Sequence, residues 1–509
     1  MKTVHFLTIA AAAVLAASSC DYAEMGGNFY PAMPDGMYAS KETADGDLPD
    51  PQAGDNFDEI IENAFIKVAD EPVSTFSVDA DGASYSYMRR CINSGYLPNA
   101  NAIRTEEFLN YFTFDYADPT GDESVAINSE IGVCPWNTEH YLLRLGLKGK
   151  TLAEADMPVA NYILLVDTSG SMSGTDRIDL LKSGLCNMID YMRPTDRIAI
   201  ITYSGEVKRI LESTLVKDAD KIKKAIKKLE ASGYTPGGEA MKMAYDEAVE
   251  HYIAGGNNRI IMCTDGDFNV GVTSTEALVE MVESYLDKGI YLSIMGFGTG
   301  NYQDSKMESL SNHGNGTYTY IDSEEEMMKV FVHERSHFFS VANDTKCQVH
   351  FFDWVDSYRL IGYENRVMNN EDFENDKKDA GEIGAGQTIT ALYELIPSGS
   401  ITQEATAATF EVRYKKALGD ESRLLHLNVG KYYEGVTKTS KEFNFAAGLA
   451  AYAMILRNSE YKGNADYSMV NELIGSAEKP GGDVDPQKLR SSLLKLIEKA
   501  SKIWQGEDR

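Results

Sequence analysis

The sequence predicts an α/β fold in which a mostly parallel sheet is covered by helices on both faces. Between about residues 158 and 340, short apolar runs typical of buried strands alternate with longer segments that have apolar residues at helical spacing. This alternation is typical of parallel strands joined by right-handed helical crossovers. The periodicity changes on either side, so we expect this doubly wound sheet to be inserted between β-rich and helical flanking regions.

Each element of the central segment follows from its local pattern. We expect strands at 162–167, 197–203, 259–264, 290–297 and 316–321. We expect helices at 177–192, 218–230, 236–252, 274–287 and 323–339. A short run at 207–211 is predicted to add one antiparallel strand at the edge of the sheet.

The two flanking regions differ in their predicted secondary structure. Residues 57–115 are predicted to be helical, notably at 83–93 and 103–112, and 124–149 is predicted to form short strands. Beyond 341 we expect strands at 347–352, 388–395, 408–414 and 424–429, then helices at 445–458, 468–477 and 487–504. Neither set of strands is large enough for a stable sandwich alone, so we expect both to share one β-rich domain.

The length of the chain indicates how many domains it has, and its net charge limits what it can bind. A chain of 509 residues is too long for one core and suggests two to four domains, which we place at 57–157, 158–340 and 341–509. The chain carries 48 Lys and Arg against 78 Asp and Glu, a formal charge of −30. This acidic excess argues against nucleic-acid binding, because little would neutralise phosphates.

The amino terminus is typical of an exported protein. Residues 1–19 have a basic start, an apolar Ala-rich stretch and small residues before Cys20, which indicates a signal peptide. The placement of Cys20 resembles a bacterial lipobox, although Ala17 stands where Leu is usual. By that resemblance Cys20 is lipidated and 20–56 is a flexible tether to a membrane of the bacterial cell envelope. An ordinary secretory signal with an incidental cysteine is the alternative.

The other cysteines do not suggest a metal site. The five cysteines after Cys20 are scattered from Cys91 to Cys347, without CxxC or zinc spacing. A disulfide between Cys91 and Cys134 is possible in an exported protein, but the spacing does not support it. We therefore expect apolar burial, and not disulfides, to hold the fold together.

Oxygen-bearing side chains gather where three predicted elements begin or end. Asp167, Ser169 and Ser171 follow a strand, Thr235 precedes a helix, and Asp265 ends a second strand. In an open α/β sheet such loops converge on one crevice. Carboxylates and hydroxyls without His or Cys suit one Mg²⁺, Mn²⁺ or Ca²⁺ ion and not zinc.

This constellation resembles the metal-ion-dependent adhesion site of von Willebrand factor type A (vWA) domains, which have a Rossmann-like fold. The resemblance implies that Asp167, Ser169 and Ser171 bind the cation. It implies that Thr235 binds directly or through water, and that Asp265 acts mainly through water.

The resemblance extends beyond the adhesion-site motif. The chain is similar to a bacterial family of vWA lipoproteins with conserved regions on both sides of the vWA domain. The matching strings lie at 73–79, 134–137, 264–271, 358–366 and 376–384.

The cation chemistry predicts a binding protein. One direct carboxylate and a few hydroxyls leave a divalent ion partly positive, so an Asp or Glu of a partner protein is the natural further ligand. No dedicated general base is evident beside the predicted ligands, which argues against a metal hydrolase, although Asp267 is near enough in the sequence to be considered. We therefore expect a lipid-anchored envelope protein that binds a protein partner and is not an enzyme.

Two alternatives remain open. His333-Glu334-Arg335-Ser336-His337 fits HExxH, the zinc helix of metallopeptidases. The apolar stripe of this predicted helix lies opposite the histidines, which favours solvent-facing side chains over a zinc site. A structural envelope scaffold, in which the cation only stabilises loops, is the other alternative.

Overall fold

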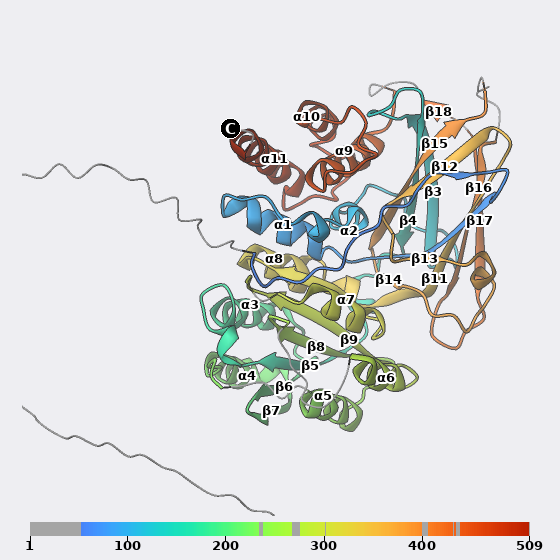
Figure 1. The fold of residues 1–509 in the computed structure, drawn as a ribbon. Helices are drawn as coiled ribbons and strands as arrows, with labels where there is room; N and C mark the ends of the chain where they lie inside the picture. The colour runs from blue at the N-terminus through green and yellow to red at the C-terminus, as the bar shows by residue number, and fades with distance from the viewer. Residues whose placement is uncertain are drawn as a thin grey trace, which may run out of the picture. The chain divides into compact units, whose positions relative to one another are not determined.

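A six-stranded sheet lies at the centre of the α/β domain, in the order β10-β9-β8-β5-β6-β7 (Figure 1). The computed structural model describes residues 52–233, 238–266, 275–300, 302–399, 406–430, 432–433 and 438–507. The strands are β5 (Ala160–Asp167), β6 (Arg197–Ser204), β7 (Glu206–Leu215), β8 (Asn257–Thr264), β9 (Ile290–Phe297) and β10 (Tyr318–Ile321). Neighbours pair in parallel, except that β6 and β7 pair antiparallel. The predicted doubly wound, mostly parallel sheet is confirmed.

Helices cover both faces of this sheet. Successive side chains of a strand point to opposite faces, and those of β5 are buried on both. Ile163 and Leu165 pack into one apolar cluster, whereas Leu164 and Val166 pack into another. The first cluster includes α5 (Gly238–Glu250), α6 (Thr275–Leu286) and α7 (Asp304–Asn312), and the second includes α3 (Ile178–Tyr191) and α4 (Ala219–Lys227).

Strands from both sides of the α/β domain form a two-sheet β-sandwich with a common apolar core. One sheet has the order β1-β12-β15-β4-β3-β18 and the other β13-β2-β11-β16-β17, with β14 paired to β11. Their bounds are β1 (Ile66–Lys67), β2 (Val73–Ser77), β3 (Val125–Val133), β4 (Tyr141–Gly149), β11 (Ser340–Phe351), β12 (Val355–Ile361), β13 (Val367–Met368), β14 (Ile383–Gly384), β15 (Thr388–Pro397), β16 (Ala408–Lys415), β17 (Arg423–Val429) and β18 (Tyr432–Tyr433). β4 pairs with β15 from Tyr141↔Leu395 to Lys148↔Thr388, so the two flanking regions share a sheet, as predicted.

The carboxyl-terminal helices pack beside two amino-terminal ones (Figure 1). They are α9 (Lys441–Leu456), α10 (Tyr467–Ser476) and α11 (Leu489–Glu507), and their neighbours are α1 (Ala83–Asn93) and α2 (Thr105–Asn110). α9 is apolar on all sides and is buried along almost its whole length, as expected of a central helix. Its Glu442 pairs with the buried Arg490 of α11, with Oε2 and Nη2 2.8 Å apart.

The prediction of a helical segment at 57–115 is wrong in part. α1 and α2 are present, but β1 and β2 precede them. Val73–Ser77 is extended because β11 pairs with it, with Cys347 opposite Phe76. β12 and α7 were also not predicted.

The predicted helix at 323–339 is wrong beyond its first turns. The segment consists of α8 (Glu324–Met328), a π-helical turn (Lys329–His333) and a 3₁₀ turn (Arg335–Phe338). The side chains of Asn257 and Arg259 each donate a hydrogen bond to the carbonyl oxygen of Phe338 at 3.0 Å. These donors take the place of the amide that a continuing helix would supply, so the chain leaves the helix here and enters β11.

The cysteines and the amino terminus complete the comparison with the predictions. All five cysteines among the described residues are free, so the possible pair Cys91 and Cys134 is not formed. Cys20, the signal peptide and most of the tether lie outside the described residues. None of the helices in the described part of the chain has the length and apolar character needed to cross a lipid bilayer.

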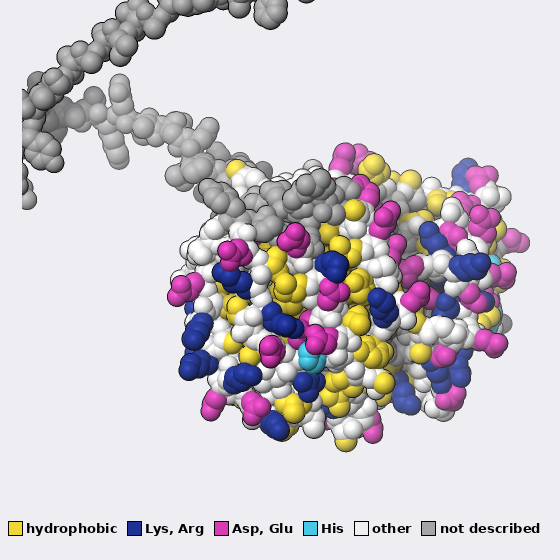
Figure 2. Space-filling model, turned by 90° about the horizontal axis from the view of Figure 1, so that it is seen from below, with side chains coloured by type: hydrophobic (Ala, Val, Ile, Leu, Met, Phe, Trp, Pro, Cys, Tyr) yellow, Lys and Arg dark blue, Asp and Glu magenta, His cyan; other side chains and the backbone are white. Residues whose placement is uncertain are grey.

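The acidic excess is not segregated on the face of the molecule that Figure 2 shows. Acidic and basic side chains alternate there, with hydrophobic side chains between them. This face therefore has no continuous basic surface of the kind that nucleic acids require.

Candidate cation-binding site

Asp167 is the last residue of β5, and its carboxylate is fully buried. Oδ1 accepts a hydrogen bond from the backbone amide of Ser169 at 2.8 Å, and Oδ2 accepts one from Thr264 Oγ1 at 3.1 Å. The side chains of Ser169 and Ser171 face each other, with their Oγ atoms 2.8 Å apart. The structure therefore brings the first three predicted ligands together at one end of the sheet.

A second loop is held against this one by backbone hydrogen bonds. Ser232 donates from its amide to the carbonyl of Thr168 at 2.7 Å, and Gly170 donates to the carbonyl of Gly233 at 3.1 Å. Thr235, the predicted ligand of this loop, lies two residues further on and outside the described residues. The described part of this loop, up to Gly233, is thus hydrogen-bonded to the backbone on both sides of Ser169.

The third loop leaves the neighbouring strand β8. Asp265 is buried directly after that strand, which pairs in parallel with β5. Thr264 Oγ1 also accepts a hydrogen bond from the amide of Gly266 at 3.0 Å. Gly266 has φ +89°, and a Cβ there would lie 2.8 Å from the backbone nitrogen of Gln303, so glycine is required for this turn.

Burial controls the charge of the site. Burial, together with the negative charge of Asp265, raises the pKa of Asp167 to about 6, although the hydrogen bonds from Ser169 and Thr264 lower it. Within the described part of the chain, no Lys or Arg forms an ion pair with Asp167. A buried carboxylate beside two hydroxyls and without a basic partner fits a hard divalent cation.

Thr264 is a positioning residue that the sequence analysis did not identify. Its hydroxyl donates to Asp167 and accepts from Gly266, so it joins the first and third loops. Its place directly before Asp265 at the end of a buried strand was the available signal.

The HExxH segment does not form the predicted helix. The turn at Glu334 (φ −110°, ψ 16°) separates His333 from His337, so the two are not one turn apart on an α-helix. Glu334 Oε2 lies 2.6 Å from Lys329 Nζ and 3.7 Å from His337 Nδ1. His333 is solvent-facing as predicted, but His337 is half-buried, and burial lowers its pKa to about 4. Nothing in this geometry favours a zinc site.

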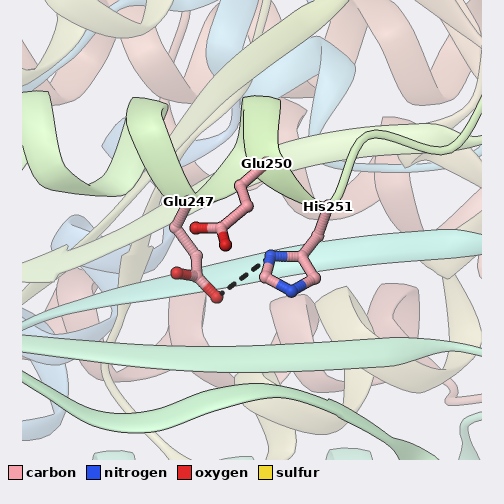
Figure 3. A group of neighbouring side chains, drawn as sticks. All are labelled: Glu247, Glu250 and His251. Carbon is pink, nitrogen blue, oxygen red and sulfur yellow. Dashed lines mark ion pairs between the residues drawn. The ribbon is translucent and has the colours of Figure 1, made fainter.

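A group on α5 is also of metal-ligand type. Glu247, Glu250 and His251 lie close together at the end of the helix, with His251 Nδ1 3.4 Å from Glu247 Oε1 (Figure 3). Arg209 of β7 already pairs with Glu247, and it lies 3.8 Å from Glu250. The guanidinium supplies the positive charge here, so this group is a structural ion-pair cluster.

Three family models match the chain. One described as von Willebrand factor matches residues 51–144, and one described as von Willebrand factor type A domain matches 162–267. The third, Uncharacterized protein YfbK, C-terminal, matches 336–503.

The similarity to one relative covers most of the chain. Uncharacterized protein YfbK of Escherichia coli is 36% identical over 469 residues, which are 87% of this chain and 80% of that protein. Uncharacterized protein sll0103 of Synechocystis is 29% identical over 38% of this chain and 45% of its own. Human inter-alpha-trypsin inhibitor heavy chain H3 is 29% identical over 34% of this chain and 21% of its own.

Solved structures with a similar arrangement are more distant. A von Willebrand factor type A protein from Catenulispora acidiphila has a TM-score of 0.44 and 13% identity, and the match covers 75% of this chain and 91% of that one. BatB from Bacteroides thetaiotaomicron has a TM-score of 0.31 and 20% identity, covering 35% and 98%.

Proposed function

The chain belongs to the family of von Willebrand factor type A proteins that includes YfbK of Escherichia coli, and from this premise we propose a cation-dependent protein-binding function. In this proposal Asp167, Ser169 and Ser171 hold one divalent cation, Mg²⁺ or else Mn²⁺ or Ca²⁺. Thr235 and Asp265 complete the set from their own loops. An acidic side chain of a partner protein binds at the position of the ion that faces solvent.

The observation that best supports this proposal is the environment of the Asp167 carboxylate. Its buried carboxylate meets an amide and a hydroxyl, and the hydroxyls of Ser169 and Ser171 lie side by side next to it. Few neutral ligands around one carboxylate leave a divalent ion electrophilic, and a carboxylate from outside satisfies that charge best. Among the described residues of the site we find no acid–base pair that would point to bond cleavage, so recognition is the function we propose.

The location of the protein is also part of the proposal. The signal-like residues 1–19 and Cys20 support a lipid anchor in the bacterial cell envelope. The chain from about 20 to 56 would then separate the folded part from the membrane. Radiolabelled fatty acid should enter the wild-type chain and not a Cys20→Ala variant, and label in the variant would contradict the anchor.

The central experiment compares Asp167→Ala with wild type. We expect titration with Mg²⁺ to show binding by the wild type that Asp167→Ala loses. Partners that co-purify from cell envelopes should be lost with Asp167→Ala and with EDTA, and should return to the wild type when Mg²⁺ or Mn²⁺ is added.

Asp287→Ala is the matched control, because this exposed carboxylate follows α6 in the same domain. It should bind both the cation and the partner as the wild type does. Partner binding that persists undiminished in EDTA would show that the binding surface lies elsewhere.

A further inference from the structure

A second group of carboxylates lies where the β-sandwich meets the α/β domain. Asp344 belongs to β11, and Asp379 and Glu382 belong to the segment that leads into β14. One oxygen of each lies within 4.8 Å of the others. None of them belongs to the loops around Asp167, so this is a separate feature of the molecule.

One of the three carboxylates forms an ion pair with a basic residue. Lys415 Nζ lies 2.5 Å from Asp344 Oδ2. The nearby Arg259 donates to the Ser293 hydroxyl and to a backbone carbonyl instead. Among the described residues, only Asp344 of the three carboxylates has a Lys or Arg at ion-pair distance, so Asp379 and Glu382 are left to bind a further cation.

An independent observation concerns Asn315, which belongs to the α/β domain. It lies between α7 and β10 and is only 2% exposed. Its Nδ2 donates to Glu382 Oε1 at 2.7 Å, which holds the amide group against the carboxylates. Its Oδ1 is buried and has no hydrogen-bond partner among the described residues. A buried amide oxygen without a donor is costly, and a cation would satisfy it.

A cavity of about 300 Å³ gives access to this group and room for water ligands. Asn315, Asp379 and Glu382 line it, as does His313. The ring nitrogens of His313 are directed elsewhere, with Nδ1 2.7 Å from the carbonyl of Ser309 and Nε2 3.9 Å from Glu283. The four side chains that meet here, those of Asp344, Asp379, Glu382 and Asn315, offer oxygen atoms, which suit a hard cation better than zinc.

We propose that Asp344, Asp379, Glu382 and Asn315 form a second divalent-cation site of calcium type. Three carboxylates and an amide oxygen suit Ca²⁺, which accepts more protein ligands and less regular geometry than Mg²⁺. The cation would bind the β-sandwich on one side and the α/β domain on the other. Its role is to fix the contact between the two domains, so it does not depend on the proposed partner binding.

The test uses the full chain with Asp167→Ala, which removes a direct ligand of the first site. Calorimetric titration with CaCl₂ should show one ion per chain in this variant. Adding Glu382→Gln, which keeps the acceptor for Asn315, should weaken Ca²⁺ binding at least about tenfold, since even outer partners of metal ligands contribute that much. Asp379→Asn, at an exposed residue, should do the same and guards against a folding defect.

Glu374→Gln is the control, because Glu374 is an exposed carboxylate in the same connection between β13 and β14. It should leave Ca²⁺ binding unchanged. Ca²⁺ should also raise the unfolding temperature of Asp167→Ala, and not that of the Glu382 and Asp379 variants, because a ligand stabilises the state that binds it. Absence of Ca²⁺ binding by folded Asp167→Ala, or equal binding by the Glu382 and Glu374 variants, would overturn the proposal.

Discussion

Carboxylates are buried in two ways in this molecule, and the contrast separates a binding site from a structural contact. At the end of β5, Asp167 meets an amide and a hydroxyl and pairs with no Lys or Arg of the described residues. Between α2 and α7, three carboxylates surround one guanidinium. Arg104 lies 3.0 Å from Glu107, 2.5 Å from Asp304 and 2.7 Å from Glu308.

The difference shows where the chain supplies its own countercharge. The Arg104 cluster joins the amino-terminal region to the α/β domain, and each of its three carboxylates contacts the guanidinium directly. The carboxylate of Asp167 has no such contact with a Lys or Arg among the described residues, and in the proposed function a cation would supply the countercharge. Removing the charge of Arg104 should therefore destabilise the fold. Removing the charge of Asp167 should stabilise it when no cation is present.

The largest effect is expected for Arg104→Met. The three carboxylates would lose the buried guanidinium that contacts all of them, and breaking such a cluster typically costs about 3–5 kcal/mol of unfolding free energy. Chemical denaturation followed by circular dichroism measures this loss. Arg413→Met, which removes a more exposed pair with Asp376, should change it much less. A loss below about 1 kcal/mol for Arg104→Met would remove the contrast.

A smaller effect of opposite sign is expected for Asp167→Asn in EDTA. Folding raises the pKa of Asp167 to about 6, so the folded state holds this proton more tightly than the unfolded state does. Wild-type stability should therefore fall as the pH rises from about 4 to above 6, and the Asn variant should lack this component. Near pH 8 the variant should be more stable by about 1–3 kcal/mol.

Two conditions check the sign of that prediction. Below about pH 4 the advantage of Asp167→Asn should disappear, because the wild-type carboxyl is then protonated in both states. Saturating Mg²⁺ should reverse the order at neutral pH, because the cation stabilises only the chain that binds it. A variant that is less stable than wild type in EDTA at pH 8 would mean that the carboxylate is compensated within the chain.

The sequence predicted best what neighbouring residues determine. Residues 290–297 were predicted as a strand and form β9, because an apolar run of that length suits a buried parallel strand. Val73–Ser77 was missed because its strand conformation depends on pairing with β11, about 270 residues later in the chain. The helix at 323–339 failed for a similar reason, since Asn257 and Arg259 reach the Phe338 carbonyl from another strand.

The two candidate cation sites differ in the same way. Asp167, Ser169 and Ser171 follow from a short string at the end of one strand, and the structure brings them together. The group around Glu382 was not predicted, because its members come from distant segments whose meeting depends on how the sandwich lies against the α/β domain. No local spacing could have indicated it.

The smallest effect is expected for Thr264→Val, which tests how Asp167 is held. Valine keeps the shape of the buried side chain but removes the hydroxyl that donates to Asp167 and accepts from the Gly266 amide. Loss of these bonds should cost about 1 kcal/mol of stability and weaken Mg²⁺ binding, because the carboxylate and the third loop lose their common support. Thr202→Val on β6 is the control, since its hydroxyl donates only to the Lys208 carbonyl, at 3.4 Å. If the two variants bind Mg²⁺ equally well, Thr264 acts in packing alone, and the amide of Ser169 is sufficient to hold Asp167 in position.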